Sequence, residues 1–316
     1  FYPYPKDKVP FPDDVTYKAY TDGGGTLAKD DWRRSQIDQF IARMYTSAKE
    51  KKPYLKVGIS PFGIWRPGHP AGIEGFDAYA KLHADAKKWL NEGTLDYAAP
   101  QLYWAISSPK QSFPKLLDWW IGQSVVGRPV IPGIYTSRLD PADAKGTWDS
   151  TEIVDQIKMV RSRSGTGGVI HFSMKALAKN YKDVGIALAT GVYDKPAIPP
   201  YFESCDTQPP SDIPPLDNLI CELKEDQQLA ITWNPPVQER VIVVAWRLED
   251  GSWVTTPVSA GLGGTDHPAK GVTHAAIAPL SRAGKLGKWV VFEPVKPEPQ
   301  PVPAVSPPTA PPQVAP

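Results

Sequence analysis

The residues of this chain that could carry out chemistry are aromatic and amide side chains near the ends of short apolar segments. Gln101, Tyr103 and Trp104 end the segment 95–104. An aromatic ring offers a flat apolar face that suits a pyranose ring, and an amide can hydrogen-bond sugar hydroxyls. The alternatives are a ring packed in the core and a buried amide with its hydrogen bonds satisfied. Because neighbouring strand residues point to opposite faces, we expect only one of Tyr103 and Trp104 to face a cleft, and Gln101 to share the side of Tyr103.

Similar side chains stand where other predicted strands end, or in a loop that leads into a predicted helix. With the three above, the predicted substrate-binding residues are Ser60, Arg66, Tyr135, His171, Trp32 and Arg33. An arginine could bind the carboxylate of an acidic sugar, and the alternative is a surface salt bridge. For His171, which lies inside a predicted strand, the alternative to a catalytic role is a hydrogen-bonded core histidine.

The composition excludes several classes of partner. The 316 residues have a formal net charge of +1, with lysines and arginines spread along the chain, so no strong field selects nucleic acid. No run of about 18 apolar residues exists, which predicts no membrane span. Cys205 and Cys221 match no metal or redox spacing, so we expect neither a metal nor another cofactor, and a disulfide between them stays open. A neutral polymer such as a polysaccharide fits this charge balance.

Strand-like and helix-like segments alternate through the first part of the chain, after an opening stretch, 1–28, that is predicted to be irregular. Strands are predicted at 54–65, 95–104, 129–136 and 168–173, and helices from residue 31 and at 79–90, 113–121, 150–163 and 181–190. This alternation indicates a parallel sheet with helices packed outside it. It leaves open half of a barrel or a small doubly wound sheet. No glycine-rich phosphate loop follows a strand, which disfavours a nucleotide-binding sheet.

The composition and the predicted secondary structure of the chain change after residue 195. Residues 196–215 are rich in Pro, Asp and Ser and are predicted to be a linker. Strand-like segments then occur at 219–223, 229–233, 241–248, 253–255, 273–277 and 289–292. Six or seven short strands separated by turns predict a small all-β sandwich over 216–294. Residues 295–316 are proline-rich, which predicts an extended, solvated tail.

Five segments in order resemble the glycosyl hydrolase-like 10 family of bacterial envelope proteins. They are 1–5 (FYPYP), 31–34 (DWRR), 58–66 (GISPFGIWR), 95–104 (LDYAAPQLYW) and 170–173 (IHFS). The terminal β region resembles a fibronectin type III module. The family resemblance implies that residues 1–195 are the C-terminal half, strands 5 to 8, of a (β/α)₈ TIM barrel. The family's strands 1 to 4, and an aspartate pair after strand 4, have no counterpart here, so we expect an isolated piece of a longer protein.

The resemblance also implies a function. It points to a glycoside hydrolase-like protein, a glycosidase as the full-length parent, acting outside the cytoplasm on a bacterial envelope polysaccharide such as peptidoglycan glycan strands. The catalytic carboxylates would be the missing pair, so no catalytic residue is assigned and this chain alone is expected to be inactive. The alternative is a carbohydrate-binding or cell-wall-anchoring protein without catalysis, which the aromatic strand ends and the β module fit equally well.

Overall fold

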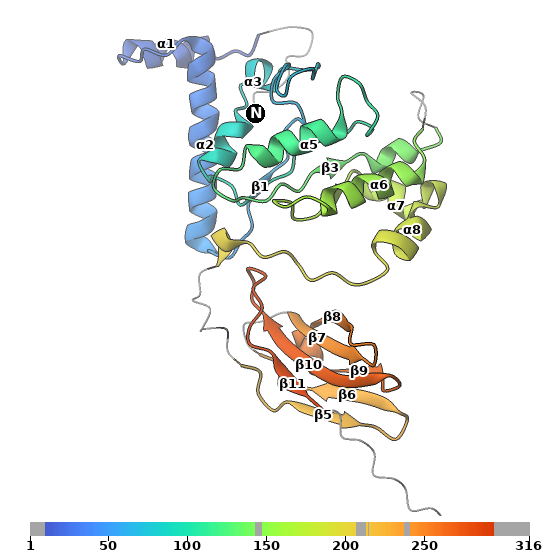
Figure 1. Ribbon diagram of the computed structural model, residues 1–316. Coiled ribbons are helices and arrows are strands. Elements are labelled where there is room, and N and C mark those ends of the chain that lie inside the picture. Colours follow the sequence, from blue (N-terminus) through green and yellow to red (C-terminus); the bar gives the residue numbers. More distant parts are fainter. Residues whose placement is uncertain (1–9, 143–146, 207–212, 214, 237–240, 294–316) are drawn as a thin grey trace, which may run out of the picture.

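Four strands of the α/β region pair in the order in which they occur along the chain. Figure 1 shows the helices of this region and the longer strands of the C-terminal region that follows it. The contacts come from a computed structural model, which describes residues 10–142, 147–206, 213, 215–236 and 241–293. The strands are β1 (Gly58–Ile59), β2 (Tyr97–Ala98), β3 (Gly133–Ile134) and β4 (Ile170–His171). β1 pairs with β2 and β3 with β4, all parallel, and parallel bridges from Ala98 to Val130 and from Gln101 to Gly133 join the two pairs.

The regular strands are shorter than predicted because prolines interrupt them. Pro61, Pro100 and Pro132 lie at or next to the strands and have no N–H to donate to a ladder. Their carbonyls still accept, so pairing continues beyond the regular strands: the N–H of Gly133 donates to Pro100 at 2.9 Å and that of Ile170 to Pro132 at 3.0 Å.

Helices pack against these strands and form one apolar core. They are α2 (Lys29–Lys51), α3 (Ala78–Lys81), α4 (Ala86–Asn91), α5 (Phe113–Gly122), α6 (Ser150–Arg161), α7 (Met174–Ala178) and α8 (Val184–Ala187), with a π-helical turn at Leu188–Val192. Leu116 and Trp120 of α5 and Ile153 of α6 are fully buried in the same cluster as Val130 and Ile134. The indole of Trp120 donates to the carbonyl of Gly63 at 2.8 Å, which satisfies its buried N–H. No helix in the described ranges is long and apolar enough to span a bilayer.

Two predictions for the first ninety residues are wrong. The opening stretch is not irregular throughout, because α1 covers Asp14–Asp22. The helix predicted at 79–90 is two helices, because His83 between them has a left-handed φ of 50°. Asp77 and Asp85 cap the two pieces: their side chains accept from the N–H groups of Ala80 and Lys88.

The C-terminal region is a sandwich of two antiparallel sheets. It contains β5 (Ile220–Leu223), β6 (Gln228–Thr232), β7 (Val241–Leu248), β8 (Trp253–Ser259), β9 (Gly264–Pro268), β10 (Val272–Leu280) and β11 (Val290–Phe292). One sheet has the order β5-β6-β9 and the other β11-β10-β7-β8. Ile231 from the first sheet and Val244 and Ile277 from the second have no exposed surface and share one core. The sequence did not predict β9, whose Gly, Asp and Pro are rare in strands.

The described part of the predicted linker forms hydrogen bonds with both the α/β region and the sandwich. The N–H of Phe202 donates to Ala283 of the sandwich at 2.9 Å, and Lys285 of the sandwich pairs with Asp206 at 2.8 Å. On the other side, Ser204 donates to Asp96, just before β2, at 2.6 Å. The thiols of Cys205 and Cys221 are free and form no disulfide. The predicted tail, 295–316, and the FYPYP segment lie outside the described residues.

Asp96 is the polar centre of this junction. Its carboxylate has no exposed surface and contacts Lys49 at 2.8 Å, and it accepts from Tyr45, Ser204 and the N–H of Val57. Burial alone would raise the pKa of Asp96, but the hydrogen bonds from Lys49, Ser204 and Val57 outweigh it and lower the pKa. A lowered pKa in the folded state contributes stability that is present above the unfolded pKa and is lost as pH falls through the folded value.

We expect Asp96→Asn to reduce the free energy of unfolding near neutral pH by about 3 kcal/mol, because Lys49 would lose its buried partner. The difference from the natural chain should shrink below about pH 4, where the carboxylate is protonated on unfolding. Urea unfolding at several pH values measures both. The control is Asp155→Asn, which removes a carboxylate that is 57% exposed and should change stability by less than about 0.5 kcal/mol. Equal effects of the two substitutions would contradict the prediction.

Candidate functional site

Three aromatic rings from three neighbouring strands meet at the carboxyl edge of the parallel sheet. Tyr103, Tyr135 and Phe172 follow β2, β3 and β4, and we call them the aromatic rim. The ring centroid of Tyr103 lies 5.2 Å from that of Tyr135 and 5.1 Å from that of Phe172, with the latter pair stacked. Phe172 is 47% exposed, so an apolar ring face is open to solvent at this edge. The carboxyl edge is where parallel sheets of this class bind their ligands.

The backbone beneath the rim is shaped to hold the rings. A Cβ on Gly133 would lie 3.3 Å from the ring of Tyr103, so glycine at this strand position lets the ring approach the sheet closely. Ser137 and Ser173 join the chain after β3 to the chain after β4: their hydroxyls are 3.0 Å apart, and the N–H of Ser173 donates to Ser137 at 2.9 Å. These contacts fix two of the three segments that carry the rim before any ligand arrives.

The hydroxyl of Tyr103 stays protonated at neutral pH. Burial raises the pKa of Tyr103, and the neighbouring Tyr135 raises it further. A neutral phenol can both donate and accept a hydrogen bond. The rim therefore combines ring faces with hydroxyl groups, a chemistry suited to an uncharged, hydroxyl-rich ligand.

Two other predicted residues lie near this edge. Gln101 donates to the carbonyl of Ser60 at 3.2 Å and is 3.5 Å from its hydroxyl, which links the ends of β1 and β2. Trp104 points the other way and packs against the core, close to Gly63. Tyr103 and Trp104 thus lie on opposite faces, and only Tyr103 joins the rim.

His171 is held by hydrogen bonds at both ring nitrogens. Its Nδ1 lies 2.8 Å from the hydroxyl of Thr136, and its Nε2 lies 3.1 Å from that of Tyr193. Burial lowers the pKa of His171. The ring is therefore neutral near pH 7 and orients its neighbours, which is the arrangement of a hydrogen-bonded structural histidine.

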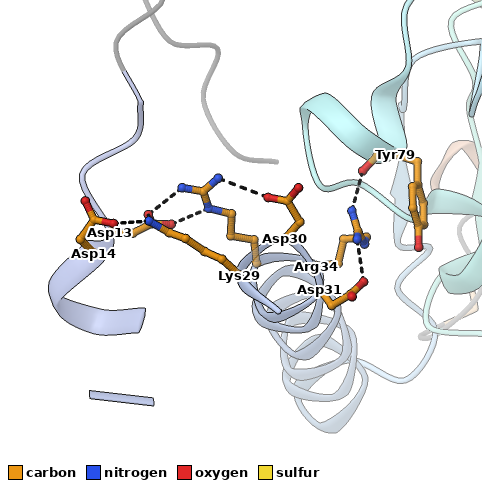
Figure 2. Close-up of polar contacts among 8 residues, drawn as sticks. Asp13, Asp14, Lys29, Asp30, Asp31, Arg34 and Tyr79 are labelled. Atoms are coloured by element: carbon orange, nitrogen blue, oxygen red, sulfur yellow. Dashed lines mark hydrogen bonds and ion pairs between the residues drawn. The ribbon is translucent and has the colours of Figure 1, made fainter. Parts of the chain in front are cut away.

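The remaining predicted residues do not reach the rim. Trp32 is buried, 6% exposed, against Tyr17 and Tyr20 of α1. Arg33 forms a two-pronged ion pair with Asp13, at 2.7 and 2.8 Å. Figure 2 shows Asp13 beside Lys29 and Asp30 at the start of α2. Because α1 was not predicted, the partners of Trp32 in that helix and of Arg33 at its N-cap, Asp13, were not expected.

Arg66 lies with a second arginine around one tyrosine. Its guanidinium is 4.7 Å from the ring centroid of Tyr79, and its Nε pairs with Asp77 at 3.3 Å. Arg34 lies 4.2 Å from the same ring and donates to the carbonyl of Tyr79 (Figure 2). Both arginines are therefore engaged in cation–π contacts and ion pairs, away from the aromatic rim.

Among the described residues, the first carboxylate to follow one of the four parallel strands is Asp140, six residues after β3, and it pairs with Lys175 at 3.2 Å. The five residues that follow each of β1, β2, β3 and β4 include no Asp or Glu. Within the described part of the chain, no three His, Cys, Asp or Glu side chains gather to hold a metal ion. Phe172, Thr136 and Tyr193 also belong to this region and were not among the predicted site residues. Phe172 could have been predicted, because it lies between His171 and Ser173 at the end of the predicted strand 168–173.

Comparison with known proteins bears on the α/β region. Residues 1–142 match the family model "Glycosyl hydrolase-like 10". The chain is 35% identical over 252 residues to "Glycosyl hydrolase YngK" of Bacillus subtilis (strain 168), covering 76% of this chain and 48% of that protein. It is 39% identical over 112 residues to "Glycosyl hydrolase DigH" of Escherichia coli (strain K12), covering 34% of this chain and 25% of that protein. The chain thus spans about half the length of the first relative and a quarter of the second.

The β region is similar to solved fibronectin type III domains. One is the fn3 domain of human collagen alpha-1(XX), with 15% identity, a TM-score of 0.24, and coverage of 28% of this chain and 89% of that chain. Another is chicken CNTN1 FN1-FN3, with 10% identity, a TM-score of 0.21, and coverage of 26% of this chain and 32% of that chain. The sandwich architecture itself rests on the strand pairing described above.

We expect the pKa of His171 to lie below about 6.5, the ordinary value for histidine, because the buried ring loses hydration when charged. The unfolded chain then binds this proton more readily, so the contribution of His171 to stability falls as pH drops below about 6.5. NMR titration of the ring protons measures the pKa, and the same titration in urea should return it to about 6.5. If the pKa of His171 in the folded chain were equal to or higher than its pKa in the unfolded chain, a negatively charged partner would be stabilising the charged ring.

Proposed function

We propose, from the match of residues 1–142 to the glycosyl hydrolase-like 10 family model, that this chain is the glycan-holding part of a glycosidase. The substrate we infer is a polysaccharide of the bacterial envelope, such as a peptidoglycan glycan strand, and the location is outside the cytoplasm. The observation that carries the proposal is the aromatic rim: three rings from three strands, at the carboxyl edge of a parallel sheet.

The rim supports sugar binding through the physical chemistry of its rings. Phe172 stacks on Tyr103 and is still 47% exposed, so a pyranose could lie against its exposed surface and exclude water from its own apolar face. Phenol hydroxyls on Tyr103 and Tyr135 provide donors and acceptors for the ring substituents. Gln101 at the neighbouring strand end extends the same polar edge toward Ser60.

We also infer that β1 to β4 are half of a (β/α)₈ barrel, corresponding to strands 5 to 8. Strands that pair in chain order, all parallel, support this assignment, since a doubly wound sheet reverses its strand order at a switch point. In such a barrel the aromatic rim would form one wall of the mouth, and residues of the other half would form the opposite wall.

A second candidate function is carbohydrate binding or cell-wall anchoring without catalysis. It is favoured by the lack of any Asp or Glu within five residues after β1, β2, β3 or β4. Glycosidases that follow the usual mechanism need two carboxyl groups about 5 to 10 Å apart. The two functions differ in one respect. A glycosidase needs a pair of carboxylates beside the rim, supplied by another part of a protein as long as the relatives, whereas a binding protein needs none.

Replacing Phe172 with Ala should weaken binding of a soluble chitin oligosaccharide about tenfold, because a stacked aromatic contact is worth about 1 to 1.5 kcal/mol. Isothermal titration calorimetry of the chain measures the change. Trp253→Ala is the matched control, since Trp253 is 45% exposed on β8, and it should leave the affinity unaltered. If both substitutions weakened binding equally, or if Phe172→Ala left the affinity unchanged, the rim would not be part of the glycan site.

Residues 1–316 alone should bind this glycan without hydrolysing it, because the five residues that follow each of β1, β2, β3 and β4 include no Asp or Glu to form a carboxylate pair. The measurement is release of reducing ends over a long incubation, with a known glycosidase as the positive control. Turnover by this chain would overturn the assignment of the catalytic carboxylates to the part of the fold that the chain does not contain.

A further inference from the structure

A second pair of aromatic rings lies at the carboxyl edge of the sheet, where the first strand ends. Phe62 follows β1, and its ring centroid lies 5.1 Å from that of Phe76, which precedes the N-cap of α3. Phe76 packs against the core of the α/β region, whereas Phe62 is 38% exposed. We call these two residues the second platform. It presents an aromatic surface to solvent at a strand end that the aromatic rim does not reach.

The second platform shares a side of the sheet with the aromatic rim. The amide nitrogen of Gln101 lies 3.5 Å from the hydroxyl of Ser60, so these two side chains project from the same face. Phe62 lies two residues after Ser60, Tyr103 lies two residues after Gln101, and alternate residues of a strand share a face. A parallel bridge between Phe62 and Gln101 extends the pairing of β1 with β2 to this point. Gln101 therefore joins the second platform to the rim.

The backbone around Gly63 fixes the segment that carries Phe62. A Cβ on Gly63 would lie 2.2 Å from the carbonyl oxygen of Gln101, so glycine is needed for the two chains to approach this closely. The carbonyl of Gly63 accepts from the indole of Trp120 at 2.8 Å, and the N–H of Gln101 donates to the carbonyl of Pro61 at 3.0 Å. Phe62 thus lies between two anchored residues, as expected for a side chain of a preformed binding site.

The distance between the two aromatic sets exceeds the size of one sugar ring. β1 pairs with β2, a bridge joins the segments of β2 and β3, and β3 pairs with β4. Paired strands lie about 4.8 Å apart, so three steps separate the segments of Phe62 and Phe172 by about 14 Å along the sheet. A carbohydrate that contacts both residues must therefore be a chain of several sugars.

Polar groups lie between the two aromatic sets. Gln101 uses its amide nitrogen on Ser60, which leaves its amide oxygen as an acceptor for a sugar hydroxyl. Ser60 is itself exposed, so its hydroxyl is open to a ligand. The second platform, Ser60, Gln101 and the aromatic rim include no Asp, Glu, Lys or Arg. This composition suits an uncharged, hydroxyl-rich chain rather than an ionic ligand.

We propose that the glycan lies as an extended chain across the carboxyl ends of β1 to β4, with one sugar on Phe62, another on Phe172, and Gln101 hydrogen-bonded to a sugar between them. The proposal rests on the proposed glycan-binding function, and it adds a second contact and an orientation of the chain. A short oligosaccharide then occupies one aromatic set and a longer one occupies both, so affinity rises with chain length.

Isothermal titration of residues 1–316 with the chitin disaccharide and the chitin pentasaccharide tests the proposal. The natural chain should bind the pentasaccharide about tenfold more tightly, because only the longer ligand makes the second aromatic contact. Phe62→Ala should abolish this difference and leave the affinity for the disaccharide unchanged, since the three rings of the rim hold the shorter ligand. Phe40→Ala is the matched control: Phe40 is 54% exposed on α2, and its loss should leave the tenfold difference intact.

A conservative variant separates loss of the ring from a disturbed fold. Phe62→Tyr keeps the ring and should retain the tenfold difference, whereas a disturbed fold would weaken the binding of both ligands. The proposal is overturned if the natural chain binds both ligands equally, if Phe62→Ala retains the difference, or if Phe62→Tyr loses it.

Phe172→Ala distinguishes failure of this proposal from failure of the proposed function. If Phe172→Ala weakens binding of the disaccharide while Phe62→Ala binds both ligands like the natural chain, the rim binds glycan and only the second platform is wrong. If neither oligosaccharide binds the natural chain, the glycan-binding function fails, and the second platform fails with it.

Discussion

Parallel pairing of four strands in chain order is the constraint on which the rest of this structure depends. It sends every carboxyl end to one edge of the sheet and every amino end to the other. Tyr103 and Tyr135 are 32 residues apart along the chain, and Tyr135 and Phe172 are 37 apart, yet the three rings meet because each follows its own strand. By the same constraint, Asp96 and Lys56, which precede β2 and β1, lie at the other edge, where the sandwich is attached.

The two edges differ in what holds them together. At the carboxyl edge the contacts are between neighbouring rings and serine hydroxyls, and a large part of Phe172 remains open to water. At the amino edge a buried carboxylate takes hydrogen bonds from α2, from the backbone before β1 and from the linker. A buried charge is tolerated only when its partners are all in place, so this edge is the more strictly specified of the two.

Sequence reasoning located the strands and most helices because their apolar periodicity is strong, as in α5, where Phe113, Leu116, Leu117 and Trp120 are fully buried. It separated Tyr103 from Trp104 by strand alternation, without knowing which would face the cleft. It failed for Trp32 and Arg33 because their partners belong to α1, a helix that buries no residue of its own and so lacks a clear apolar stripe. It missed the junction at Asp96 because Ser204 is 108 residues away and no local pattern links them.

The anchored linker also bears on how such chains can be assembled from parts. Domains of one chain are usually joined by exposed, flexible linkers across which few contacts are made. Here Phe202, Ser204 and Asp206 each bond to a different partner in one region or the other. A foreign sandwich that arrived with its own connector would take the Ser204 hydrogen bond away from Asp96, and a foreign sandwich alone would take Lys285 away from Asp206. Inheritance of the two regions should therefore be linked through these few connector residues.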